Sequence, residues 1–218
     1  MPSQDPLAAA KADLKPAFKP QDFSVFVFGP ALGSIPVLEP TSPVSDHAQV
    51  VEHARYLRYL TKKRLEELDF RADFGEAKDV FKFWSEFFSA PDVASTEILH
   101  ANKACGAVII FPASFGSIAE LALSARHPRI AAKTVAIVHE AYSDAASFFR
   151  RGILEIFDDH DGKMRFVNYA NHNACIERAV RYVRGKFSRL LGEADEVMEI
   201  QRRHKGTVFE HAFKGGAD

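Results

Sequence analysis

One short segment places a carboxylate and two hydroxyl groups at spacings that suit chemistry on a sugar. It runs from Ser114 to Glu120, and Gly116 and Ser117 lie between them. An apolar run at 106–111 precedes it and predicts a buried strand, and a helix is expected after it. Open α/β sheets bind ligands where strands end, and the free amides of a helix N-terminus suit phosphate. We therefore expect Ser114, Gly116 and Ser117 to hold phosphate or ribose. Glu120 would attack or stabilise the cation that forms when an N-glycosidic bond breaks.

The same segment also has a purely structural interpretation. Ser117 and Glu120 are spaced as a capping box, in which the serine caps a helix and the glutamate bonds back to the cap amide. In this interpretation, the role of Gly116 is merely to allow a tight turn. The catalytic and structural interpretations of Glu120 stay open at this point, and both roles could coexist in different states.

The segment resembles the Pro-Gly-Gly-x-Gly-Thr-x-x-Glu signature of the Lonely Guy-type nucleotide phosphoribohydrolases of the SLOG superfamily. Four residues match it, with serine in place of threonine: Pro112, Gly116, Ser117 and Glu120. Ala113 and Ser114 replace two of its glycines. The segment is also similar to the Gly-Thr-Ala-x-Glu-Leu-Gly motif of nucleoside deoxyribosyltransferases. That resemblance implies that Glu120 is a nucleophile on the sugar C1′.

The chain is further similar to bacterial anti-phage effectors of this fold, including retron-associated ones, with a Gly-Ser-x-Ala-Glu-Leu run after an apolar strand. Tyr142 and the segment 147–152 add to this likeness, which spans residues 22–190. The resemblance implies an N-glycosyl hydrolase or transferase that cleaves the base–ribose bond of a nucleotide or NAD, a homo-oligomer, and a role in phage defence. The alternative is a non-catalytic SLOG-type sensor of nucleotide signals or an interaction subunit, and the two replaced glycines favour the sensor.

Further binding residues are expected at the ends of two other strands. After the first strand come Gly29, Pro30 and Gly33, although ordinary turn chemistry explains these glycines equally well. After the fourth strand come His139 and Tyr142, which could contact the base or the sugar. The alternative for His139 is a loop histidine that makes structural hydrogen bonds. Three arginines are candidates for holding a phosphate: Arg55, Arg150 and Arg151.

Strands and helices alternate along the chain, which predicts a Rossmann-like, doubly wound and mainly parallel five-stranded sheet. The strands are expected at 23–28, 70–74, 106–111, 134–139 and 164–169, with 106–111 in the centre because it is apolar throughout. The first helix is expected to begin near residue 46, and further helices are expected at 76–88, 92–104, 121–125, 144–157 and 171–191. A flexible N-terminal arm is expected at 1–21, the nucleotide-binding domain at 22–192, and a C-terminal helix and tail at 193–218. The helix at 76–88 carries an aromatic face that predicts self-association.

Composition restricts the remaining functions. The net charge is −1, so no global charge indicates nucleic acid or membrane as a partner. The basic residues 178–189 form one helix face, usually a solvated one, that could instead meet an acidic partner or nucleic acid. No dinucleotide fingerprint, Walker loop, calcium loop or zinc spacing is present, so neither cofactor nor metal is expected. No signal peptide or membrane span is apparent, which predicts a cytoplasmic protein.

Overall fold

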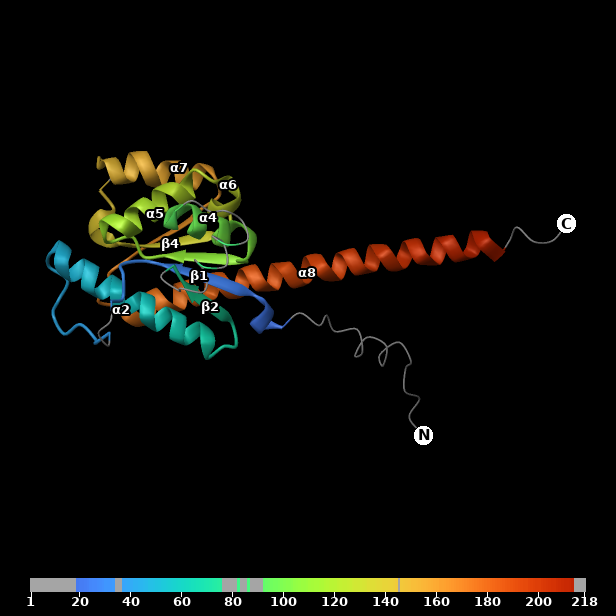
Figure 1. The fold of residues 1–218 in the computed structure, drawn as a ribbon, viewed down its shortest axis with the longest axis horizontal. Coiled ribbons are helices and arrows are strands. Elements are labelled where there is room, and N and C mark those ends of the chain that lie inside the picture. The colour runs from blue at the N-terminus through green and yellow to red at the C-terminus, as the bar shows by residue number, and fades with distance from the viewer. Residues whose placement is uncertain are drawn as a thin grey trace, which may run out of the picture. The chain divides into compact units, whose positions relative to one another are not determined.

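The computed structural model describes residues 19–33, 37–75, 82, 86, 92–144 and 146–213. Residues 20–186 form one compact unit built on a five-stranded sheet of order β2-β1-β3-β4-β5, and every strand pair is parallel (Figure 1). The strands are β1 (Ser24–Phe28), β2 (Arg71–Phe74), β3 (Ala107–Ile110), β4 (Thr134–His139) and β5 (Lys163–Val167). The predicted doubly wound α/β fold with the 106–111 strand in the centre is confirmed.

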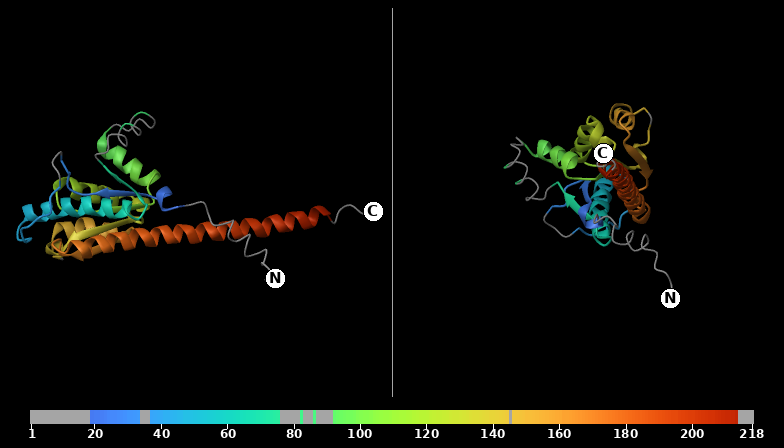
Figure 2. Two further views of the ribbon diagram at one scale, coloured as in Figure 1. Left: turned by 90° about the horizontal axis from the view of Figure 1, so that it is seen from below. Right: turned by 90° about the vertical axis from the view of Figure 1, so that its right-hand side faces the viewer.

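Helices cover both faces of this sheet. One face carries α4 (Val93–Lys103), α5 (Phe115–Ala125), α6 (Pro128–Ala131) and α7 (Glu155–Asp159), and the other carries α2 (His47–Glu66) with the first part of α8 (Figures 1 and 2). A short 3-10 helix at Pro20–Asp22 precedes β1, and another at Glu140–Tyr142 follows β4. Asp46 caps α2 and Asp92 caps α4, each accepting a hydrogen bond from a first-turn amide.

The core follows the alternation of side chains along the strands. Phe26, Val108, Ile110 and Val138 cluster with residues of α4 to α7, whereas the intervening residues of the same strands are buried toward the opposite face. Every residue of β3 and β4 is buried. Both strands are therefore closed to solvent along their length. Side chains that contact a ligand can only lie where these strands end.

Two predicted helices differ from the structure. A regular helix was expected at 144–157, but Phe149–Leu154 is a π-helix that leads into the short α7. The helix expected at 171–191 is longer, because α8 runs without a break from His172 to Phe213. The aromatic helix expected at 76–88 lies outside the described residues, except for positions 82 and 86. Within the described part of the chain, no helix combines the length and apolarity that a bilayer requires.

Candidate functional site

The parallel sheet brings the predicted site residues to one edge. β1, β3 and β4 are neighbours, so the loops that leave their carboxyl ends start side by side. The first of these loops contains Gly29, Pro30 and Gly33, the second Ser114 with Gly116 and Ser117 in the following helix turn, and the third begins at His139 and reaches Tyr142. The reversal of strand order between β1 and β3 is the position at which this fold class binds ligands.

Two serines organise the start of α5. Ser114 is the N-cap, and its hydroxyl accepts a hydrogen bond from the Ser117 amide at 3.2 Å. The buried Ser117 hydroxyl accepts from the amides of Ala113 and Ser114, both at 2.9 Å, and bonds the Ser114 carbonyl oxygen at 3.0 Å. The amides of Phe115 and Gly116, the first two in the helix, have no intrahelical acceptor and point toward the loop side. Ser117 thus stabilises the loop conformation, and the amides of Phe115 and Gly116 can bind an anion.

The capping-box interpretation of Glu120 is wrong. The capping box of α5 joins Ser114 and Ser117, and Glu120 is the sixth residue of the helix, too far along to reach the cap amide. Its Oε2 atom is buried, although the residue as a whole is only partly buried. Capping therefore gives no reason for a carboxylate at this position.

The tight-turn interpretation of Gly116 is also wrong. Gly116 lies inside α5, and its φ is not positive, so any residue could adopt its backbone conformation. A Cβ atom added there would find the Ser114 Oγ at 3.9 Å as its nearest neighbour. Packing against the described residues therefore does not require glycine at this position, and among them the absent side chain leaves the helix N-terminus open.

A buried arginine holds the loop after β1. The Arg58 guanidinium on α2 donates to the carbonyl oxygens of Val27 at 3.0 Å and Pro30 at 3.1 Å, and lies 4.7 Å from the centre of the Phe74 ring. A Cβ at Gly29 would come within 3.0 Å of the Arg58 Cδ, so glycine here permits the close approach of the arginine. Arg55, a phosphate candidate from the sequence, is exposed on another side of the same helix.

The same loop turns at Gly33, where φ is +69°. This left-handed conformation favours glycine, and none of the described residues lies within 4 Å of a Cβ added there. Turn chemistry therefore accounts for Gly33. Further along, the Ser42 carbonyl oxygen accepts a hydrogen bond from His53 Nε2 of α2 at 2.9 Å, so a second helix side chain fastens the loop.

His139 is held as a neutral ring at the end of β4. Its Nδ1 accepts a hydrogen bond from the Ala141 amide at 3.1 Å, which places the ring hydrogen on Nε2. The ring packs edge-on against Tyr169, whose hydroxyl donates to the Ile137 carbonyl oxygen. Burial lowers the pKa of His139; the Glu140 carboxylate opposes this shift, and the nearby His53 adds to it. Among the described residues, its buried Nε2 has no hydrogen-bond partner. The structural alternative thus accounts for one ring nitrogen only.

Tyr142 and the two arginines near it differ in their surroundings. The Tyr142 hydroxyl lies 2.9 Å from His47 Nδ1 of α2, so the β4 loop touches the start of the helix that follows β1. Burial raises the pKa of Tyr142. The Arg150 guanidinium lies 5.4 Å from the centre of the Phe166 ring, over β5, while Arg151 is exposed.

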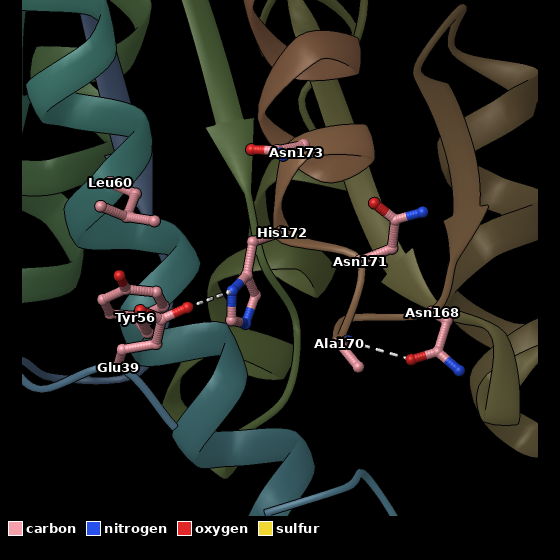
Figure 3. Close-up of a pocket in the computed structure, with 8 residues that line it drawn as sticks. All are labelled: Glu39, Tyr56, Leu60, Asn168, Ala170, Asn171, His172 and Asn173. Atoms are coloured by element: carbon pink, nitrogen blue, oxygen red, sulfur yellow. Dashed lines mark hydrogen bonds and ion pairs between the residues drawn. The ribbon is translucent and has the colours of Figure 1, made fainter. Parts of the chain in front are cut away.

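A polar cleft of about 690 Å³ opens beside this edge, between α2 and the start of α8 (Figure 3). Its lining residues are Glu39, Tyr56, Leu60, Asn168, Ala170, Asn171, His172 and Asn173. His53 Nδ1 lies 3.0 Å from His172 Nε2, and since His53 Nε2 donates to Ser42, His172 is the donor in this pair. Glu39 Oε1 lies 3.6 Å from the other His172 nitrogen. The two histidines thus link the β1 loop to the start of α8.

One comparison with known proteins decides the family. The family model of the STM3845 retron effector protein matches residues 54–213. This chain belongs to that retron effector family. The curated proteins contain no match to the chain. The retron effector match includes Ser114, Glu120 and His139 but starts after Gly29 and Gly33.

Three residues that hold this edge together were missed in the sequence. Arg58, His53 and His172 each bond a group far away in the chain, so no short motif marks them. One signal was available for His53 and Arg58, because both lie on the buried stripe of α2 with Val50 and Leu57. A polar residue on such a stripe requires buried partners. Phe115, the first residue of α5, was also missed, and it is 90% exposed beside the open amides.

Acid is expected to destabilise the protein through two histidines near this edge, His139 and His172. Burial lowers the pKa of both His139 and His172 from the ordinary value of 6.5. The unfolded chain then binds more protons than the folded one just below pH 6.5, so stability falls as the pH drops through this value. Urea unfolding at about pH 7.5 and about pH 5.5 measures the effect. The decrease in unfolding free energy between the two pH values should be smaller in His139→Asn and in His172→Asn than in wild type. An equal decrease in both variants would contradict the prediction.

Proposed function

We propose that this protein cleaves the N-glycosidic bond of a nucleotide or of NAD and acts as an effector in anti-phage defence. The observation that carries the proposal is Glu120, a carboxylate with a buried oxygen that takes no part in the capping box, on the helix that begins at the central strand. A carboxylate at this place can attack or stabilise the cation that forms at C1′ when the bond to the base breaks. The defence role is supported by membership of a retron effector family.

In the proposed reaction, the bond between C1′ and the base nitrogen breaks, and its electron pair leaves with the base, which takes up a proton. The Glu120 carboxylate either bonds to C1′, forming an ester that water then hydrolyses, or remains ion-paired with the oxocarbenium ion while water adds. Each path ends in free base and a free sugar or sugar phosphate. Transfer to a second base in place of water would make the enzyme a transferase.

The other residues of the edge are assigned to binding. The amides of Phe115 and Gly116 meet phosphate or ribose oxygens at the helix start, and the loop that Ser114 and Ser117 stabilise keeps these amides in place. Gly29, Pro30 and Gly33 close over the nucleotide. His139, as a neutral ring with its hydrogen on Nε2, donates to an acceptor on the base or sugar, with Tyr142 beside it.

A sensor that binds a nucleotide without turning it over is the second candidate. Ala113 is fully buried and Ser114 serves as the cap, where the phosphoribohydrolase signature has two glycines. Side chains at these positions restrict how closely a phosphate can approach the loop backbone. As a member of a retron effector family, such a sensor would pass the binding event to another retron component.

The decisive experiment incubates the pure protein with nucleoside monophosphates, deoxynucleotides and NAD, and analyses the products by mass spectrometry. The enzyme proposal predicts free base from at least one of them. Calorimetric binding of a nucleotide that stays intact would favour the sensor and overturn the enzyme. A protein that neither cleaves nor binds any nucleotide in the panel would contradict both candidates.

A further inference from the structure

The polar cleft between α2 and the start of α8 is not used by the proposed reaction. Tyr56 and Leu60 of α2 lie on one side of it, and His172 and Asn173 of α8 lie on the other (Figure 3). Glu39 reaches it from the loop that follows β1. All of these residues belong to the compact unit 20–186. The cleft volume of about 690 Å³ is sufficient for a small molecule.

The hydrogen bonds of two histidines decide which ring nitrogen of His172 carries a hydrogen. His53 Nε2 donates to the Ser42 carbonyl oxygen, so the Nδ1 atom of a neutral His53 ring can only accept. His172 Nε2 lies 3.0 Å from that atom and is therefore the donor. Burial lowers the pKa of His172, and His53 lowers it further, while the Glu39 carboxylate opposes the shift. In the neutral His172 ring, Nδ1 is thus left as an acceptor.

Two acceptors therefore face each other in the cleft. His172 Nδ1 lies 3.6 Å from Glu39 Oε1, and the close-up shows the carboxylate directed at this ring (Figure 3). Among the described residues, none donates a hydrogen bond to His172 Nδ1. A ligand nitrogen that carries two hydrogens can donate one to each of these acceptors. The pair is therefore complementary to an amino group.

The neighbouring side chains favour a flat, uncharged amine over an alkylammonium ion. Asn173 is exposed, and among the described residues its side-chain amide makes no hydrogen bond. This amide can donate to an acceptor beside the amino group, which an alkylammonium ion lacks. The Tyr56 ring and the Leu60 side chain offer surface on which a flat ring can pack. Adenine and cytosine carry an amino group next to a ring nitrogen, and asparagine recognises this pattern in adenine.

The other polar groups of the cleft do not suit a phosphate. Asn168 donates to the Glu140 carboxylate at 2.8 Å and accepts from the Ala170 amide at 2.9 Å. Asn171 accepts from the Ala174 amide at 3.1 Å. Among the described residues that line the cleft there is no lysine or arginine, and the one charged group is a carboxylate. The cleft thus suits the base of a nucleotide better than its phosphate.

We propose that this cleft binds an amino-bearing nucleobase, adenine or cytosine, either free or as part of a nucleoside. The amino group lies between Glu39 and His172, and the adjacent ring nitrogen accepts from Asn173. The choice of a nucleobase among flat amines rests on the proposed function, in which the protein cleaves or senses nucleotides. Because His172 is bonded through His53 to the loop after β1, a bound base also stabilises that loop.

Calorimetry with two pairs of nucleosides tests the recognition of the amino group. The pairs are adenosine with inosine and cytidine with uridine, and the second member of each has a carbonyl oxygen in place of the amine. In at least one pair the amine should bind about tenfold or more tightly, because the oxygen would face two acceptors. Equal affinities within both pairs, or no binding of any of the four, would overturn the proposal. So would ethylamine that binds as tightly as the preferred nucleoside.

Variants locate the binding in the cleft. Glu39→Ala should abolish the preference for the amine, and Asn173→Ala should weaken binding of the preferred nucleoside. Glu52→Ala is the matched control, because Glu52 is an exposed glutamate of α2 outside the cleft lining, and it should bind like wild type. Glu120→Gln should also keep the preference. A preference that survives Glu39→Ala but is lost in Glu120→Gln would place the nucleoside at the strand edge and refute the cleft.

The measurements separate this proposal from the proposed function. Base release by the wild type without a preference for the amine in either pair would refute the cleft and leave the glycosidase. A preference that Glu39→Ala abolishes, in a protein that releases no base, would support the cleft and contradict the glycosidase.

Discussion

Glu120→Gln should abolish the release of free base while leaving the fold intact. The amide side chain has nearly the shape of the carboxylate but can neither attack C1′ nor offset positive charge on the sugar. The expected loss of rate is roughly 10³-fold or more. Because Glu120 lies outside the capping box of α5, the variant loses no cap, and its unfolding free energy should change by less than about 1 kcal/mol.

Base release is measured on the nucleotide that the wild type turns over, together with the melting temperature of each protein. Glu155→Gln on α7 is the matched control, because it changes an exposed glutamate in the same way and should keep full activity. An active Glu120→Gln enzyme would remove the catalytic assignment and leave the sensor as the better account. A variant that binds nucleotide but no longer cleaves it would support the assignment.

Arg58→Ala should produce the largest loss of stability. The change removes a charged donor from the carbonyl oxygens of Val27 and Pro30 and leaves both inside the protein without it. It also removes the packing of the arginine against the Phe74 ring. Hydrogen bonds from charged groups and unsatisfied buried acceptors together predict a loss of about 3 kcal/mol or more.

Urea unfolding measures this loss, and Arg55→Ala is the control from the preceding turn of α2. Because Arg55 is exposed, its removal should change stability by no more than about 0.5 kcal/mol. Arg58→Lys should restore only part of the loss, since one ammonium lacks the fork that reaches both carbonyl groups. Equal stability of Arg58→Ala and Arg55→Ala would show that the arginine does not hold the β1 loop.

The sequence alone was sufficient for the architecture and for the place of the candidate site. Strands β1, β3 and β4 appear as continuous apolar runs, because a parallel strand covered by helices is buried on both faces. Burial of this kind is a local property of the residue types, so it can be recognised without coordinates. The edge position of Gly29, Ser114 and His139 then follows from the parallel order of their strands.

Tertiary structure decided how the residues at that edge are used. The sequence pattern at Ser117 and Glu120 fits a capping box, but the helix begins one turn earlier because Ser114 takes the cap and Ser117 completes it. Two serines compete for the same role, and local spacing cannot rank them. Likewise, the bonds from Arg58 to Pro30 and from His172 to His53 join segments that meet only after the sheet has formed. Contacts of this range depend on which helices cover which face, so only the folded chain reveals them.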